Sequence, residues 1–193
     1  MPPQQVVVTR HGETEWSRDG RHTGRTDLPL TEHGERQARE LRSTLAGWDF
    51  AAVFSSPLQR ALATARLAGF VDDVIIDPDL QEWDYGDYDG RTSAEIRHER
   101  PGWVLWRDGC PGGESIDQVA RRAERAIGRF RSFDGDVLAF SHGHLLRILT
   151  ARWLDMNATA GQHFLLGPAA PSTLGYEHDW TALLRWNDSP HAK

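Results

Sequence analysis

The alternation of short apolar runs with segments of helical periodicity constrains the fold of this chain most strongly. A continuous apolar run rich in β-branched residues is typical of a strand buried on both faces. Four such runs are predicted strands: Val6–Thr9, Ala51–Phe54, Val74–Ile76 and Val137–Phe140. Helices are predicted at Thr31–Gly47, from Ser56 to about Gly69, at Ser115–Phe130 and after His144 to about Leu154. Strands that alternate with helices indicate a mainly parallel α/β sheet.

Capping residues mark where two of these helices begin. Thr31 has the hydroxyl of an N-cap, and Gly47 is a residue type that ends helices. Ser56 followed by Pro57 predicts a second start. The serine would be the N-cap and the proline would occupy the first helical position.

Two regions depart from the strand–helix alternation. The segment from Asp77 to Gly113 is longer than a normal connection and rich in Asp, Gly, Trp and Tyr, with one short helix predicted near Ser93–Glu99. Long insertions of this kind often carry function. Near the C-terminus, Thr173–His178 and Leu183–Trp186 predict a hairpin around Asp179 and Trp180.

Length and charge limit the kinds of protein this chain can be. Its 193 residues suit one domain, so we expect a single domain over residues 1–193 with the insertion at about 77–113. Tails at Pro2–Pro3 and Asn187–Lys193 are expected to fray. The net charge of −6 argues against a nucleic-acid partner, which needs a basic surface. A negative net charge is still compatible with a local cationic pocket that binds a small anionic substrate.

The sequence also predicts where the protein resides. Cys110 is the single cysteine, so no intramolecular disulfide forms, which fits a reducing compartment. There is no apolar stretch of about 18 residues or more, so no membrane span is expected. The first residues lack the charged and apolar regions of a signal peptide. We therefore predict a cytoplasmic protein.

Polar, chemically active residues follow three of the predicted strands. The first strand runs into Arg10 and His11, the second is followed by Arg60 one turn into a helix, and the fourth runs into His142. Ligands of open α/β sheets bind beyond the carboxyl ends of the strands. If these strands are neighbours, the four side chains converge there. Two arginines supply fork-shaped donors suited to phosphate, and the histidines could act as a nucleophile and a charged donor. Helix N-termini and the amides of Gly12 and Gly143 would add anion-binding dipoles.

A metal site is the main competing interpretation of these histidines. His142 and His144 could ligate zinc. A zinc site needs three or four clustered ligands, however, and the cationic Arg10 and Arg60 would repel a divalent ion. We therefore predict no metal. A plain polar turn remains the alternative for each tripeptide taken alone.

Cleavage of a phosphate ester also needs a general acid, because the departing alkoxide must be protonated. Glu82, just after the third predicted strand, is the first choice, with Asp84 and Asp87 as rivals. Trp83 beside it would shield the carboxyl group from water. Packing of the loop is the alternative role for the aromatic residues Trp83, Tyr85 and Tyr88.

Five separated blocks, in order, resemble the histidine phosphatase superfamily, also called the phosphoglycerate mutase-like family. They are RHGETEW at Arg10–Trp16, RHTGRTDLPLTEHGERQA at Arg21–Ala38, SSPLQRALATA at Ser55–Ala65, EWDYGDYDG at Glu82–Gly90 and SHGH at Ser141–His144. The resemblance spans nearly the whole chain. It implies a three-layer α/β/α sandwich around a mainly parallel sheet, no metal or organic cofactor, and, as in many similar proteins, a homodimer.

The resemblance also implies roles for individual residues. His11 would become phosphorylated, Arg10, Arg60 and His142 would clamp the phosphate, and Glu82 would be the proton donor. The pocket would be completed by residues of a loop and of the fourth strand end: Ser17, Thr23, Gly24 and Gly143.

The implied mechanism has two steps. Neutral His11 attacks phosphorus while Arg10, Arg60 and protonated His142 hold the oxygens. Protonated Glu82 gives its proton to the leaving oxygen, and then acts as base for the water that attacks the phosphohistidine. An acidic or near-neutral optimum is expected.

Departures from the mutases favour a phosphatase. In phosphoglycerate mutases of this family an arginine follows the catalytic glutamate, whereas Trp83 follows Glu82 here, and Arg107 stands without the expected arginine pair. The blocks look most similar to broad-specificity acid phosphatases and sedoheptulose-bisphosphatase-like enzymes, so small sugar phosphates are the expected substrates. Candidate contacts to the rest of the substrate are Arg91, Arg97, Arg107 and His144. The alternatives are a cofactor-dependent phosphoglycerate mutase and a non-catalytic phospho-ligand-binding module.

Overall fold

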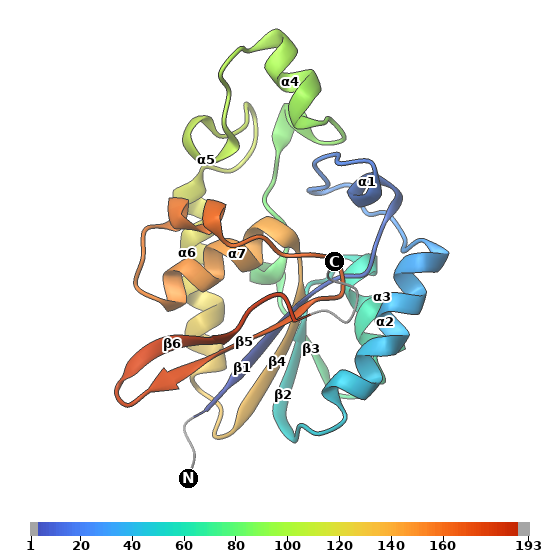
Figure 1. Cartoon of the computed structure of the whole chain (residues 1–193), viewed down its shortest axis with the longest axis vertical. Helices are drawn as coiled ribbons and strands as arrows, with labels where there is room; N and C mark the ends of the chain where they lie inside the picture. Colours follow the sequence, from blue (N-terminus) through green and yellow to red (C-terminus); the bar gives the residue numbers. More distant parts are fainter. Residues whose placement is uncertain (1–3, 189–193) are drawn as a thin grey trace.

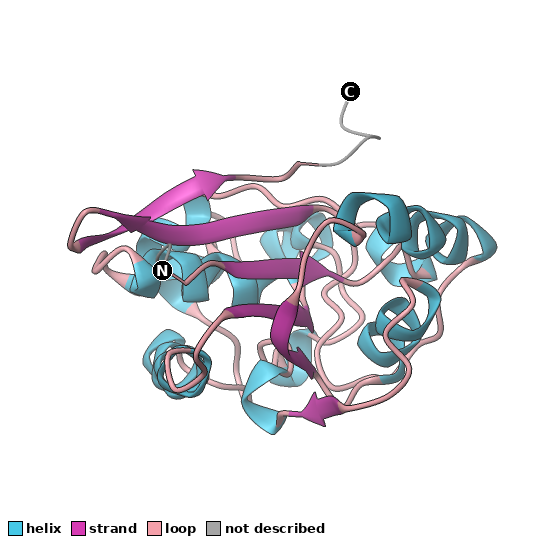
Figure 2. Ribbon diagram, turned by 90° about the horizontal axis from the view of Figure 1, so that it is seen from below, coloured by secondary structure: helices cyan, strands magenta, loops and turns pink. Residues whose placement is uncertain are grey.

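The computed structural model describes residues 4–188, and its six strands form one sheet in the order β3-β2-β4-β1-β5-β6. The strands are β1 (Val6–Arg10), β2 (Phe50–Ser55), β3 (Val74–Ile76), β4 (Asp136–Ser141), β5 (Pro171–Glu177) and β6 (Trp180–Arg185). Neighbouring strands among β1 to β4 pair in parallel, whereas β5 and β6 run antiparallel to their neighbours. Figure 2 shows the strands fanning through the usual twist of an open sheet. The predicted mainly parallel α/β fold is confirmed.

Helices cover both faces of this sheet. They are α1 (Glu15–Arg18), α2 (Glu32–Leu45), α3 (Gln59–Leu67), α4 (Ser93–Glu99), α5 (Leu105–Asp108), α6 (Ile116–Phe130) and α7 (Gly143–Trp153). Figure 1 shows α6 and α7 on one side of the sheet, α2 and α3 on the other, and α4 beyond the carboxyl ends of the parallel strands. None of the helices within residues 4–188 combines the length and the apolar character needed to cross a bilayer.

The alternating sides of β1 explain the two hydrophobic clusters. Val6 and Val8 are fully buried in the cluster that includes residues of α6 and α7, and Val7 lies in the cluster that includes α2 and α3. Successive strand residues point to opposite faces, so a strand covered on both sides is apolar throughout. The run of three valines is therefore the direct signature of a central strand.

Local capping chemistry sets most helix starts, with one correction. Thr31 caps α2 by accepting from the amide of Gly34. The start predicted at Ser56 is wrong, because α3 begins at Gln59 with Leu58 as its N-cap. The amide of Ser56 still bonds to the fourth strand, at the carbonyl of Phe140, and its hydroxyl contacts His142. The hydroxyl also accepts from the amide of Leu58 at 3.3 Å, so the predicted local hydrogen bond is present although the helix begins only at Gln59.

The long segment from Asp77 to Gly113 consists of short helical turns joined by loops, and it buries several aromatic side chains. It contains the 3₁₀ turns η1 (Pro78–Leu80) and η2 (Gly86–Tyr88) as well as the predicted helix Ser93–Glu99. Its buried aromatic residues belong to the main core cluster: Trp83, Tyr85, Tyr88 and Trp103. Packing is thus one confirmed role of these rings.

The C-terminal part forms the predicted hairpin with a shifted turn. The turn is His178–Asp179, and Trp180 is the first residue of β6 rather than a turn residue. Asn187, the first residue of the predicted C-terminal tail, is held in place, because its backbone amide donates to Ser172 and its side chain accepts from the amide of Gly167. Pro2, Pro3 and positions 189–193 of the predicted tails lie outside the described residues. A further 3₁₀ segment, η3 (Ala158–His163), packs against α7.

Candidate active site

The strand order brings the three polar strand ends together. β4 lies between β1 and β2, with Arg10 opposite Ser141 and Ser55 opposite Phe140. A pocket of about 260 Å³ opens at this edge of the sheet. The residues that line it are Arg10, His11, Ser17, Gly20, Arg21, His22, Thr23, Glu82, Tyr85, Ser93, Gly143, His144, Arg147 and Leu166. Three arginines and one carboxylate among them make the pocket cationic in a chain of net charge −6.

His11 is buried in a defined tautomer. Its Nδ1 lies 2.7 Å from the carbonyl oxygen of Gly12, which only accepts, so Nδ1 carries the proton and Nε2 keeps its lone pair. Burial lowers the pKa of the imidazole well below its ordinary value of 6.5, and the charges of Arg60 and Arg10 lower it further. The side chain is therefore a neutral base with a free Nε2.

Arg10 has a donor without an acceptor. Its Nη1 donates to the carbonyl of Leu166 at 2.7 Å, whereas its buried Nε finds no hydrogen-bond partner within the described part of the chain. Gly143 packs beside it, since an added Cβ there would lie 3.5 Å from Cζ of Arg10. An unpaired buried N–H is costly, so this corner of the pocket is suited to an anionic acceptor.

Arg60 and His142 stand behind the pocket rather than in its wall. Arg60 is fully buried and donates from Nε to Nδ1 of His142 at 3.1 Å. Its other donors bond to three carbonyls of the preceding loop, those of Thr23, Gly24 and Thr26. Nε2 of His142 lies 2.8 Å from the hydroxyl of Ser56.

His142 is neutral in this arrangement. A ring nitrogen that accepts from a guanidinium carries no proton, so only Nε2 of His142 is protonated. Burial lowers the pKa of this imidazole well below 6.5, and the charge of Arg60 adds to the effect. His142 is therefore not the charged donor expected from the sequence. The zinc interpretation also loses support, since His142 is held by Arg60 and Ser56 and His144 by Tyr85.

Glu82 is the carboxylate that reaches the pocket. Its Oε1 accepts from the amides of Leu145 at 2.8 Å and Trp83 at 2.9 Å, and its Oε2 accepts from the amide of His144 at 3.0 Å. The first turn of α7 thus holds the carboxyl group in one orientation. The rival Asp84 accepts from Gly86 and pairs with Arg25, and within the described chain neither it nor Asp87 lines the pocket.

The loop before α2 contributes less directly than expected. Ser17 lines the pocket, but its hydroxyl also completes the capping box of α1 with Thr14. Thr23 lines the pocket as well. Gly24 is not part of the pocket wall, because its amide donates to Asp89 and an added Cβ would lie 2.8 Å from the carbonyl oxygen of Trp83. Its structural role is close packing of two loops.

Gly12 likewise serves packing rather than anion binding. Its amide donates to the hydroxyl of Thr64 at 3.0 Å, so it is not available to an anion. An added Cβ would lie 2.4 Å from the carbonyl oxygen of Gly34 on α2. The glycine therefore lets the strand end approach the helix, which corrects the expectation that its amide helps to bind the anion.

Sequence reasoning missed several residues of the pocket wall. His22, Tyr85 and Arg147 line it, and the hydroxyl of Tyr85 lies 2.6 Å from Nδ1 of His144. Arg147 follows Gly143 by four residues, and residues four apart lie on the same face of a helix. The sequence spacing could therefore have predicted that Arg147 faces the pocket. The arginines proposed earlier have other partners: Arg91 pairs with Glu99, Arg97 donates to the carbonyl of Trp103, and Arg107 pairs with Asp108.

Four histidines in or directly behind the pocket predict that acid destabilises the fold. Burial is the largest cause that lowers the pKa of each of them: His11, His22, His142 and His144. The pKa of a histidine in the unfolded chain is near 6.5. Below this pH the unfolded chain binds protons at these histidines that the folded chain does not bind. Each histidine should then cost about 1.4 kcal/mol of unfolding free energy per pH unit. For His22 this continues down to its folded pKa of about 4.

Urea unfolding between pH 7.5 and 5 measures this loss. The unfolding free energy should fall with pH, and His22→Asn should make the slope shallower by the contribution of one proton. His98→Asn is the matched control, because His98 is exposed on α4 and should leave the slope unchanged. An unfolding free energy of the wild type that does not change across this range would contradict the neutral state of these imidazoles.

Comparison with known proteins places this geometry in a family. The family described as the histidine phosphatase superfamily (branch 1) matches residues 6–189. An acid phosphatase of Mycobacterium tuberculosis is 41% identical over 179 residues, 90% of this chain and 87% of the other. A sedoheptulose 1,7-bisphosphatase of Saccharomyces cerevisiae is 38% identical over 185 residues, 79% of this chain and 68% of the other. A solved structure from Mycobacterium tuberculosis superposes with a TM-score of 0.90 at 38% identity, covering 97% of this chain and 99% of that one.

Proposed function

This chain belongs to the histidine phosphatase superfamily (branch 1), and we propose that it hydrolyses small phosphomonoesters through a phosphohistidine formed on His11. That it is a phosphatase follows from the family and from its phosphatase-named relatives. The observation that carries the residue assignment is the neutral His11 with a free Nε2 in a pocket lined by arginines. The proposed nucleophile His11, the proposed anion-binding Arg10 and the proposed acid Glu82 thus line the same pocket.

The first step of the proposed reaction transfers the phosphoryl group to His11. Nε2 attacks phosphorus in line as the P–O bond to the leaving alcohol breaks. The unpaired Nε of Arg10 donates to a phosphoryl oxygen, and Glu82 protonates the leaving oxygen from Oε2, which accepts only one amide bond. The phosphoryl dianion beside His142 favours its protonated form, as an opposite charge does.

The second step returns the phosphoryl group to water. Glu82, now ionised, accepts a proton from the water that attacks the phosphohistidine, and the N–P bond breaks to release inorganic phosphate and neutral His11. Arg60 stays behind the pocket and supplies positive charge, as its effect on the His11 pKa indicates. We propose that the chemistry needs no metal, since residues of this chain supply the nucleophile, the acid and the cationic charge.

We propose that the substrates are sugar phosphates. Beyond the phosphoryl site the pocket wall is polar and offers donors and acceptors to hydroxyl groups, among them His22, Ser93 and Arg147. A relative named for sedoheptulose 1,7-bisphosphate acts on a molecule of this class. We further propose a cytoplasmic location, on the ground of the single cysteine, Cys110.

A substrate panel tests this proposal. Phosphosugars, phosphoglycerates and nucleotides are compared by kcat/KM, with release of inorganic phosphate as the readout. Phosphosugars should give the highest values, at least about tenfold above nucleotides, a difference of about 1.4 kcal/mol in transition-state binding. Bisphosphoglycerate-dependent isomerisation of phosphoglycerate without phosphate release would instead indicate a mutase. Binding of phosphosugars without any turnover would indicate a non-catalytic module.

A further inference from the structure

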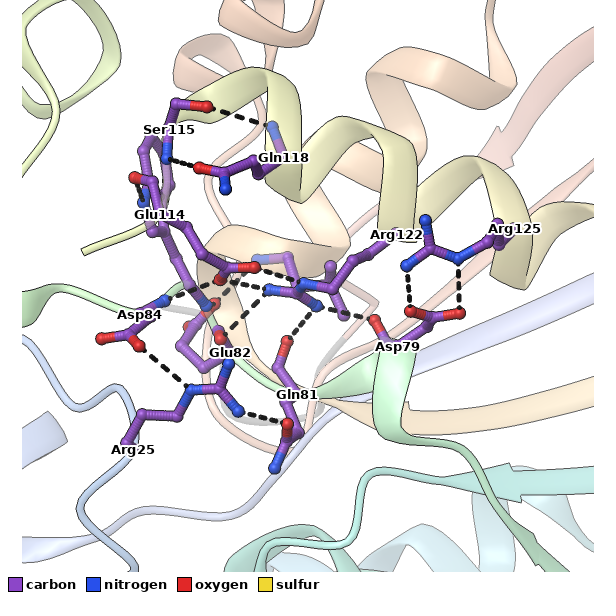
Figure 3. A network of polar contacts seen from close by, with 12 residues as sticks. Arg25, Asp79, Gln81, Glu82, Asp84, Glu114, Ser115, Gln118, Arg122 and Arg125 are labelled. Carbon is purple, nitrogen blue, oxygen red and sulfur yellow. Dashed lines mark hydrogen bonds and ion pairs between the residues drawn. The ribbon is translucent and has the colours of Figure 1, made fainter.

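One guanidinium group on α6 holds the loop that carries Glu82. Arg122 is only 9% exposed, and its Nη1 donates to the carbonyls of Asp79 at 2.8 Å and Gln81 at 2.9 Å. Its Nη2 donates to the carbonyl of Glu82 at 3.3 Å. Figure 3 shows the side chain reaching from the helix to this loop. The carbonyl of the remaining loop residue, Leu80, accepts from the hydroxyl of Ser141.

The other two donors of the same group go to Glu114. Nε and Nη2 of Arg122 each lie 2.8 Å from an oxygen of the Glu114 carboxylate, in a bidentate pair. The five N–H groups of a guanidinium are thereby all used. Burial raises the pKa of Glu114, but the bonds and charge of Arg122 outweigh it, so the pKa is lowered. Both partners are therefore charged.

Glu114 extends the network past Glu82 to the next two residues. Its carboxylate accepts from the amide of Asp84 at 3.0 Å, and its backbone carbonyl accepts from the indole N–H of Trp83 at 2.8 Å. Its own amide donates to the carbonyl of Asp84 at 2.9 Å. The pair thus fixes the backbone on both sides of Glu82 while the first turn of α7 fixes its carboxyl group.

We infer that Arg122, paired with Glu114, is a positioning residue that sets the acid–base carboxyl of Glu82 at the leaving oxygen. The inference rests on the proposed function. The backbone of the loop is anchored from α6, and the carboxyl is anchored from α7, so the orientation of Glu82 is determined from both ends. Arg122 donates no hydrogen bond to Arg10 or His11. Its positive charge does help to lower the pKa of His142. A substitution that keeps this charge therefore tests the positioning of Glu82 separately from phosphoryl binding.

A lysine cannot replace this arginine. Its ammonium group has three donors at one point, whereas the carbonyls of residues 79, 81 and 82 and the carboxylate of Glu114 surround a planar fork. Arg122→Lys keeps the charge beside Glu114 and leaves part of the loop without donors. The loop would shift, and displacement of a catalytic group by about 1 Å costs about 10²-fold in rate.

The test compares two esters that differ in their need for an acid. Glycerol 2-phosphate releases an alkoxide that must be protonated, and p-nitrophenyl phosphate releases a stable phenolate. For both, kcat/KM reports the phosphoryl transfer to His11. Arg122→Lys should lower kcat/KM about tenfold to hundredfold on glycerol 2-phosphate and less than about threefold on p-nitrophenyl phosphate. Glu114→Gln should act in the same direction with a smaller loss.

The matched control is Arg125→Lys on the same helix. Arg125 bonds to the side chain of Asp79 and not to the loop carbonyls, so both kcat/KM values should stay near those of the wild type. In a Glu82→Gln background, Arg122→Lys should cause no further loss on glycerol 2-phosphate, because it acts through Glu82. Thermal unfolding of every variant confirms that folded protein is compared.

Two results would overturn the inference. Equal losses on both esters would mean that Arg122 supports the whole pocket, and additive losses with Glu82→Gln would mean that it acts on another group. If Arg122→Lys does not fold, Glu114→Gln decides by the same comparison. Failure of the proposed function is distinguishable, since the wild type would then hydrolyse neither ester.

Discussion

Replacing His11 with asparagine is expected to lower kcat by at least about 10⁴-fold and to abolish the phosphoenzyme. The imidazole is the nucleophile of the proposed reaction, and Nε2 is its free nitrogen. His142 cannot take over, because Arg60 and Ser56 engage its two nitrogens. Steady-state hydrolysis of p-nitrophenyl phosphate gives the rate. A radiolabelled ester, quenched in detergent at alkaline pH, reports the phosphohistidine, whose label is lost on acid treatment.

His98→Asn is the control for this substitution. The residue is a solvent-exposed histidine of α4, so its loss should leave both the rate and the labelling unchanged. Retention of acid-labile label in the His11 variant would assign the nucleophile to another residue. Retention of turnover without label would favour direct attack of water on the ester.

Replacing Glu82 with glutamine is expected to lower kcat/KM on glycerol 2-phosphate by about 10²- to 10⁴-fold, and on p-nitrophenyl phosphate by about tenfold or less. An amide has no proton to give to the leaving oxygen, and only the alkoxide needs one. Glutamine keeps an acceptor for the amides of Leu145 and Trp83, so the backbone around it is preserved. The bond from the amide of His144 is lost.

The same variant should also trap the intermediate. Hydrolysis of the phosphohistidine needs Glu82 as base, so p-nitrophenolate should appear in a burst followed by slow turnover, and labelled enzyme should accumulate. Asp87→Asn is the control, because this rival carboxylate does not line the pocket. Equal losses on both esters would mean that Glu82 contributes to binding or folding and not to proton transfer.

Conditions that favour the chemistry and the fold differ. The proposed first step uses protonated Glu82, which favours low pH, whereas four neutral histidines weaken the fold as the pH falls below about 6.5. Activity in acid is therefore bounded by unfolding. Bound phosphate should reduce this loss, because it binds the folded state alone.

Elements that depend on neighbouring residues were predictable from the sequence. β3 and α4 have the predicted bounds, and α2 begins after the predicted cap at Thr31. The start of α3 was not predictable in the same way. Ser56 has the residue type of a cap, but its hydroxyl contacts His142, which is 86 positions away in the sequence. The hydroxyl also accepts from the amide of Leu58, so the residue type predicted the local hydrogen bond but not the position at which the helix begins.

The protonation state of the site histidine His142 could not be predicted from the sequence either. His142 was expected to be a charged donor. In the structure it is buried beside the positive charge of Arg60, and both effects lower its pKa and make it neutral. Gly12 and Gly24 were assigned to the anion pocket, whereas the backbones that approach them are those of Gly34 and Trp83. Burial and close approach both depend on residues far apart in the chain.

The sequence by itself determined the strands, the helices and the chemical groups at the strand ends, because apolar periodicity and caps act within a few residues. It also contained the motifs that identify the family. Only the tertiary structure decided that β4 lies between β1 and β2, which is why Arg10, Arg60 and His142 meet. It likewise decided the neutral state of His11 and the role of Arg122, since both arise from electrostatic and hydrogen-bond partners supplied by other elements.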